Sequence, residues 1–202
     1  MNNERGRPRN FDAEDALDQA VEVFWRHGYQ GASLSELTQA MGLNKPSLYG
    51  AFGDKEALYL KALQRYREQR LAGHAAQLAT EPDARRAVEG FLQGMTDLFT
   101  DEALPGGCFI VNGSADTGSA NTPAAVTEAL HQGLLANEEC LRERLLLARD
   151  EGQLPKNTNV AALAAMYLSL IAGIAVLAKS GASRRKLQGL LVCASGLWPG
   201  PP

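Results

Sequence analysis

One segment near the N-terminus carries polar side chains at a spacing that suits contact with a nucleic acid. Asn44, Lys45, Ser47 and Tyr49 lie close together, and Pro46 stands among them. Amide, ammonium and hydroxyl groups donate hydrogen bonds to phosphates, and from a helix they reach base edges in a major groove about 12 Å wide. The chemistry that this segment favours is therefore DNA binding.

Two short helices must position these side chains. The apolar spacing predicts a helix that starts at Ser33, where Glu36 three positions on completes a capping box. Gly42 ends this helix and permits a sharp turn. A second helix is predicted from about Lys45 to Phe52, with Pro46 in its first turn, where the missing N–H costs nothing. This is helix-turn-helix spacing, although a glycine between short helices also occurs in ordinary bundles.

Further basic residues flank the two short helices. Arg5, Arg7 and Arg9 precede the first apolar-periodic segment with no acid among them, and we expect an arm that follows a groove or the DNA backbone. Lys55 falls in the first turn of the next helix, where it opposes the helix dipole. A phosphate partner explains a lysine at that position better than local stability does.

The rest of the chain predicts an all-α fold. Strand signals are scarce, whereas apolar residues recur with the helical period to the C-terminus. About nine helices are expected, near residues 12–27, 33–42, 45–52, 54–78, 83–101, 108–115, 123–151, 160–178 and 184–198. We expect two domains, an N-terminal arm with a helix-turn-helix over 1–53 and a larger helical domain over 54–202.

Residues 11–63, FDAEDALDQAVEVFWRHGYQGASLSELTQAMGLNKPSLYGAFGDKEALYLKAL, resemble the DNA-binding domain of the TetR/AcrR family of bacterial transcriptional regulators. The segment PGGCFIVNGSAD, residues 105–116, also resembles a subset of that family. The resemblance implies a homodimer with three DNA-binding helices per subunit and a larger domain for ligand binding and dimerisation. It maps Ser33, Lys45, Ser47, Tyr49 and Lys55 onto positions that commonly contact phosphates or bases, with Asn44 and Pro46 at the variable, sequence-reading end. Gly50 departs from the family, which more often has a larger side chain there.

The function that follows is a ligand-responsive regulator, a homodimeric repressor that a small-molecule effector releases from a palindromic DNA operator. Paired helices over 160–178 and 184–198 are expected to form the dimer interface. An effector pocket in the larger domain would draw on apolar residues, and plain core packing is the alternative for each of them. The candidates are Phe91, Met95, Phe99, Cys108, Phe109, Met166, Tyr167 and Leu170.

The three cysteines, Cys108, Cys140 and Cys193, are widely spaced and form no CxxC pair, so neither a disulfide framework nor a zinc site is indicated. The histidines do not cluster with acids or cysteines at ligand spacing. No metal and no cofactor are expected, and a reducing cytoplasm fits this cysteine usage. Cys108 follows two glycines near a predicted helix start, so an oxidant or electrophile sensor and an inert buried thiol both stay open.

Two other classes of protein must be considered. A small helical enzyme has no support, because no Ser/His/Asp ordering, phosphate loop or metal motif is present. A membrane-anchored protein would use the uncharged run 160–178, which nearly matches the roughly 30 Å core of a bilayer. That run is rich in alanine and glycine, so a helix buried in a core or subunit interface is favoured and no membrane is expected. The net charge of -3 gives no global signal for nucleic acid.

Overall fold

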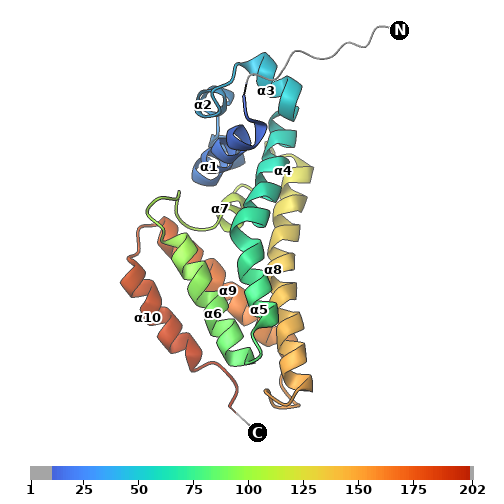
Figure 1. Ribbon diagram of the computed structural model, residues 1–202, viewed down its shortest axis with the longest axis vertical. Coiled ribbons are helices and arrows are strands. Elements are labelled where there is room, and N and C mark those ends of the chain that lie inside the picture. Colours follow the sequence, from blue (N-terminus) through green and yellow to red (C-terminus); the bar gives the residue numbers. More distant parts are fainter. Residues whose placement is uncertain (1–10, 201–202) are drawn as a thin grey trace, which may run out of the picture.

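A computed structural model describes residues 11–200, and the regular structure in this part of the chain is helical (Figure 1). The elements are α1 (Ala13–Gly31), α2 (Leu34–Ala40), α3 (Lys45–Phe52), α4 (Lys55–Tyr66), the π-helical turn η1 (Arg67–Leu71), α5 (Ala72–Thr80), α6 (Ala84–Phe99), α7 (Phe109–Ser114), α8 (Ala124–Asp150), α9 (Val160–Lys179) and α10 (Arg184–Ser195). The run from α4 to α5 is continuous. Counted as one helix, it makes nine helices among the described residues, which confirms the all-α prediction.

Helices α1, α2 and α3 form a small unit at the top of Figure 1, which we call the head. Its apolar side chains are fully buried and hold the three helices on one core: Ala20, Phe24, Leu37, Leu48 and Leu58, the last supplied by α4. The N-cap Asp12 starts α1, since its carboxylate accepts from the backbone N–H groups of Glu14 and Asp15. A core this small is sufficient only because α4 closes it from one side.

The helix from α4 to α5 runs from the head into the larger unit, which we call the body (α6 to α10). Tyr59 and Tyr66 on this helix both contact Phe109 edge to face, with ring centroids 5.3 and 5.5 Å apart. The same two tyrosines meet Phe24 and Trp25 of the head, each pair at 4.9 Å. An aromatic cluster therefore joins head and body, and edge-to-face pairs of this kind favour defined relative orientations.

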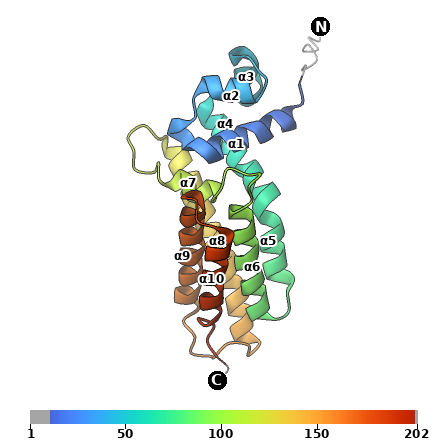
Figure 2. The ribbon, with the colours of Figure 1, turned by 90° about the vertical axis from the view of Figure 1, so that its left-hand side faces the viewer.

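The body packs α6, α8 and α9 together, and Figure 2 shows α10 on its outside between α9 and α6. Among the described residues, α9 is the one helix long and apolar enough to cross a membrane by length and composition, as the sequence suggested. One side of this helix lies in the core through Leu163, Ala164, Tyr167, Ile171 and Ile174. Its other side is covered by no part of the described chain.

Gly107 lies so close to neighbouring atoms that replacing it by alanine should lower the free energy of unfolding. Its φ is +65°, and a Cβ there would lie 2.8 Å from the Ala175 carbonyl oxygen and 2.9 Å from Asn112 Oδ1. We expect Gly107→Ala to cost about 3 kcal/mol in the free energy of unfolding, measured by denaturant titration. Gly181→Ala is the matched control, because φ there is +88° but the surrounding space is open. It should cost only about 1–2 kcal/mol, and equal losses in the two variants would contradict the clash.

Candidate nucleic-acid interface

Helix α3 packs against the head core on one side and is capped at its N-terminus. Leu48 and Phe52 are buried against the head core. Asn44 is the N-cap, and its Oδ1 accepts a hydrogen bond from the backbone N–H of Ser47 at 2.9 Å. Pro46 occupies the first turn, as the sequence predicted. These contacts set the direction of a helix of only eight residues, too short to be stable alone.

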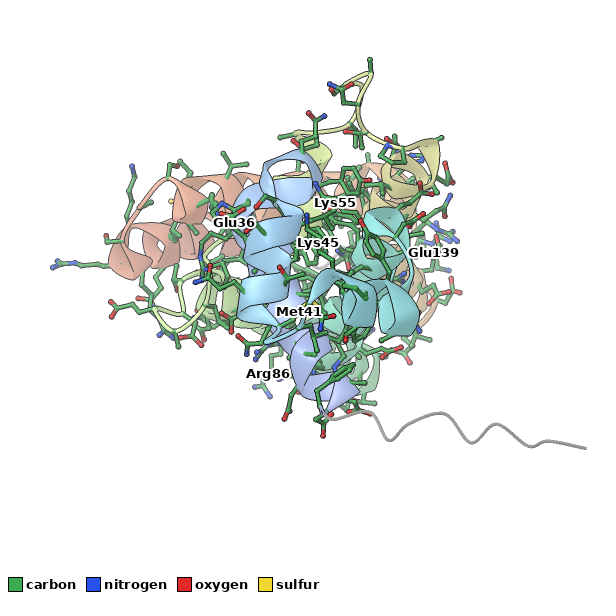
Figure 3. The ribbon with its side chains drawn as sticks, turned by 90° about the horizontal axis from the view of Figure 1, so that it is seen from above. Glu36, Met41, Lys45, Lys55, Arg86 and Glu139 are labelled. Carbon is green, nitrogen blue, oxygen red and sulfur yellow. The ribbon has the colours of Figure 1, made fainter. Side chains whose placement is uncertain are left out.

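The opposite side of α3 is left open. Asn44, Lys45, Pro46 and Tyr49 are exposed and Ser47 is half-buried. Tyr49 keeps 44% of its surface exposed, which is unusual for an aromatic residue in a small core-forming unit. Gly50 next to it faces open space. Figure 3 looks onto this end of the molecule and labels Lys45 there. A surface that is convex, polar and aromatic at a helix N-terminus has the shape and donors for a DNA major groove.

Ser33 lies beside this surface and already forms hydrogen bonds within the protein. Its hydroxyl accepts from the backbone N–H of Glu36 at 3.1 Å, and Glu36 Oε2 accepts from the backbone N–H of Ser33 at 2.9 Å. The predicted capping box is therefore confirmed. The bond from the Ser33 backbone N–H lowers the pKa of Glu36, so this carboxylate stays charged. The capping box uses the Ser33 hydroxyl as an acceptor, so its O–H can still donate to a phosphate.

Lys55 lies at the edge of the same surface, and Figure 3 labels it with Lys45 and Glu36. Its ammonium stands over the Tyr29 ring, 4.7 Å from the centroid. Burial lowers the pKa of Lys55, while the charges of Asp116 and Glu36 act in the opposite direction. The helix dipole is thus not the only local interaction that acts on the charge of Lys55. The remaining predicted contacts, Arg5, Arg7 and Arg9, lie outside the described residues.

A carboxylate from the body holds the end of α1. Gly28 breaks this helix with φ at +70°, which turns the next backbone N–H groups outward. Asp116 Oδ2 accepts from Tyr29 N at 2.9 Å and from Gln30 N at 3.4 Å. A Cβ on Gly28 would lie 2.5 Å from that oxygen, so only glycine leaves room for the contact. The break in α1 therefore forms a small anion-binding site that the protein fills with its own side chain.

Two further side chains bind carbonyls of the same turn. Asn112 Nδ2 donates to Trp25 O at 3.4 Å and to Gly106 O at 3.1 Å. Lys179 Nζ, at the end of α9, donates to Arg26 O at 3.2 Å and to Pro105 O at 3.4 Å. We call Asp116, Asn112 and Lys179 the clamp. It ties the orientation of the head to α7 and to the end of α9.

The clamp is not marked by any local pattern in the sequence. Its contacts with α1 join residues 86 to 153 positions apart, so no period or cap indicates them. The one available signal was the resemblance over 105–116, which contains Asn112 and Asp116. Lys179 stands at the charged end of an apolar run and is typical of an ordinary helix C-terminus.

Removing the Asp116 carboxylate should weaken binding to a full operator by several-fold while leaving a single half-site unaffected or slightly tighter. Asp116 positions the head but belongs to the body. In the homodimer that the resemblance implies, its loss would free the spacing between the two heads without changing the exposed side of α3. The measurement is fluorescence anisotropy of Asp116→Ala on full-site and half-site duplexes. Asp150→Ala is the control, since it removes the same charge from an exposed position. Equal weakening on both duplexes would mean simple destabilisation of the head.

The predicted effector-pocket residues do not surround one cavity. Phe91, Met95, Phe99, Cys108, Phe109 and Tyr167 are buried, while Met166 and Leu170 are half-buried on α9. Tyr167 lines a hollow between α6 and α10, Met166 lines a shallow one beside Pro155, and Phe99 lines a third near the turn before α10. The structure thus separates these residues, and the pocket as a single site stays a prediction.

Cys108 lies at the N-cap position of α7, as expected, but its thiol is buried. Burial raises the pKa of Cys108, although the Tyr66 hydroxyl donates to its sulfur at 3.5 Å. A thiol is reactive as the thiolate, and burial disfavours that form. Of the two roles that the sequence left open, the geometry favours the inert buried thiol.

Comparison with known proteins gives matches over both units. Residues 16–62 match the family described as "Bacterial regulatory proteins, tetR family", and residues 84–191 match "Tetracyclin repressor-like, C-terminal domain". The chain is 34% identical to the HTH-type transcriptional repressor ComR of Escherichia coli strain K12, over 96% of this chain and 92% of ComR. It is 28% identical to the uncharacterized HTH-type transcriptional regulator YezE of Bacillus subtilis strain 168, over 91% and 94% of the two chains.

A solved structure is similar over nearly the whole length. It is a cysteine mutant of the TetR family transcriptional regulator CifR, in complex with 26-base-pair double-strand operator DNA. The TM-score is 0.91 and the identity 37%, over 96% of this chain and 100% of the other.

Proposed function

This chain belongs to the TetR family of bacterial transcriptional regulators, and from that premise we propose that it is a homodimeric repressor of a palindromic operator. The observation that carries the proposal is the leading edge of α3, which is anchored by Leu48 and Phe52 and open from Asn44 to Tyr49. The operator-bound CifR structure, similar at a TM-score of 0.91, supports the same use of this surface. The chain is a regulator rather than an enzyme.

The uncovered side of α9, together with α10, supports the dimer. Ala162, Ser169, Gly173 and Val176 are exposed on α9 and recur at helical spacing, with Val176 56% exposed. On α10, Val192 is 74% exposed. Small residues on adjoining helices let a second pair approach closely, so two copies would form a four-helix interface about a twofold axis. We call these exposed residues of α9 and α10 the dimer face.

In the proposed dimer, two copies of α3 lie on one side of the DNA, about 34–36 Å apart. We place the functional boundary between residues 53 and 54, with α4 to α5 connecting the operator-binding head to an effector-binding body. An effector bound in the body would change the separation of the heads through this helix and the clamp. Coupling of this kind is typically about 1–3 kcal/mol, enough to release an operator. Such a regulator works in the cytoplasm, where its DNA is.

The test is enrichment of DNA fragments from the source genome by the purified protein, followed by footprinting. We expect a short set of fragments that share a palindrome with half-sites one helical turn apart. Affinity should fall steeply with salt, at a slope of about -0.9 per phosphate neutralised. Enrichment without any twofold-symmetric sequence would contradict the dimeric arrangement, and absence of enrichment would contradict the regulator itself.

A further inference from the structure

Polar contacts join helix α10 to α6 at its two ends. Arg184, at its start, pairs with Asp97 near the end of α6. At its other end the Ser195 carbonyl oxygen accepts from Nη2 of Arg85 at 3.2 Å, and Arg85 is in the first turn of α6. Between these ties, α10 buries only Leu187 and Ala194. In the middle of the helix, Leu190 and Leu191 are half-buried and pack against the core. Helix α10 lies antiparallel over α6 (Figure 2).

A hollow of about 600 Å³ lies between these two helices. Its walls are apolar, with Val88 and Leu92 from α6, Leu191 from α10 and Trp198 after it. Pockets for small organic ligands have volumes of roughly 300–1,000 Å³ and largely apolar linings. The space between α6 and α10 thus has the size and the walls of a small-molecule site.

Tyr167 of α9 supplies a polar group to this hollow. The residue is 2% exposed and lines the cavity. Burial raises the pKa of this phenol to about 12, and Glu89 acts in the same direction. The hydroxyl is therefore a protonated donor at neutral pH, held at the cavity wall by its buried ring. A ligand oxygen in the hollow would accept its hydrogen bond.

The charges at the mouth favour an anion. Arg85 and Arg86 line the hollow with one acid, Glu89. Glu89 is bonded to Arg85 Nε at 3.0 Å, whereas Arg86 forms no ion pair with any of the described residues and is exposed. The mouth thus carries one more positive than negative charge, and the polar group within it is a donor. An apolar molecule with one acidic group complements both features.

We propose that this hollow between α6 and α10 is the effector site, and that it takes a mostly apolar organic acid whose anionic group bonds the Tyr167 hydroxyl and faces Arg86. The proposal rests on the regulator function argued above. Val192 lines the hollow and also belongs to the dimer face. A ligand that separates α10 from α6 therefore moves the helix against which the second subunit packs, and changes the spacing of the two heads.

The test uses two fluorescent probes of similar size on the full-length protein without DNA. One is anilinonaphthalene sulfonate, an apolar anion, and the other is phenylnaphthylamine, which has the same rings without the sulfonate. We expect the sulfonate to bind more tightly. Tyr167→Phe should weaken sulfonate binding by roughly tenfold, because the variant lacks one hydrogen bond to a charged group. Arg86→Glu should weaken it further, while neither variant changes binding of the uncharged probe.

Lys156→Glu is the matched control, because it makes the same charge change at an exposed position outside the hollow. Its sulfonate affinity should equal that of the unchanged protein. Equal sulfonate affinity in all three variants would overturn the site. An affinity for the uncharged probe as high as that for the sulfonate would overturn it too.

A second measurement separates the site from the proposed function. Saturating sulfonate should lower operator affinity at least about fivefold in the unchanged protein, and Tyr167→Phe should shift that response to higher probe concentration. Operator binding that the bound sulfonate leaves unaltered would overturn the effector assignment while the regulator stands. A protein that binds no operator, yet shows the expected pattern of probe affinities, would instead refute the regulator and keep the organic-acid site.

Discussion

Replacing Lys45 and Tyr49 together by alanine should abolish operator binding without unfolding the protein. Both side chains are exposed on the open side of α3. In the proposed dimer the variant removes four side chains from the proposed operator surface. At about 1 kcal/mol each, the binding free energy falls by about 4 kcal/mol, or roughly 1000-fold in Kd. The salt dependence should also flatten, by about 0.9 in slope for each phosphate that a lysine no longer neutralises. The measurement is fluorescence anisotropy on the enriched operator across a salt series.

The fold should survive this change, because neither side chain is buried. Leu48 and Phe52 keep α3 on the head core, and Asn44 still caps it. Circular dichroism and the melting temperature should therefore match those of the unchanged protein. The control is Leu147→Ala with Lys156→Ala, an exposed apolar and an exposed basic side chain of the body. If the Lys45 and Tyr49 double variant bound the operator as tightly as this control, α3 would not be the helix that contacts the operator.

Val176→Arg should dissociate the proposed dimer and lower operator affinity by at least about 100-fold. Val176 is 56% exposed on α9 in the single chain, so an arginine there leaves the monomer stable. In a twofold interface it would bring two unpaired charges into an apolar contact, which costs several kcal/mol. Sedimentation velocity should show a species of half the mass. Binding to a half-site duplex should persist, because the head is untouched.

Leu147→Arg is the control for this experiment, since Leu147 is 47% exposed on α8 and outside the dimer face. It should remain dimeric and bind the full operator. If Val176→Arg stayed dimeric, the two subunits would meet elsewhere and the uncovered side of α9 would need another partner. If it became monomeric but kept full-operator affinity, the heads would act independently, and the palindrome argument would fail.

Local signals account for what the sequence predicted correctly. The capping box of Ser33 and Glu36, the proline in the first turn of α3 and the helix end expected near residue 27, where Gly28 breaks α1, depend on neighbours within a few residues. Such signals can be read from the sequence alone. The π-helical turn Arg67–Leu71 was not foreseen, because an extra residue within a continuous helix leaves no mark on a short apolar pattern. The same limit applies to Lys55, whose aromatic partner Tyr29 lies in another helix.

The sequence by itself thus determined the helical class, the helix-turn-helix and the identity of the side chains that face outward from α3. Only the tertiary structure decided that Asp116 and Lys179 hold the end of α1, and that Cys108 is buried. It also decided that Tyr167 lines a hollow under α10, apart from the other pocket candidates. The physical reason is common to all of these. Burial and hydrogen bonding between distant segments depend on how helices pack, and packing is set by the sum of many weak contacts rather than by any local pattern.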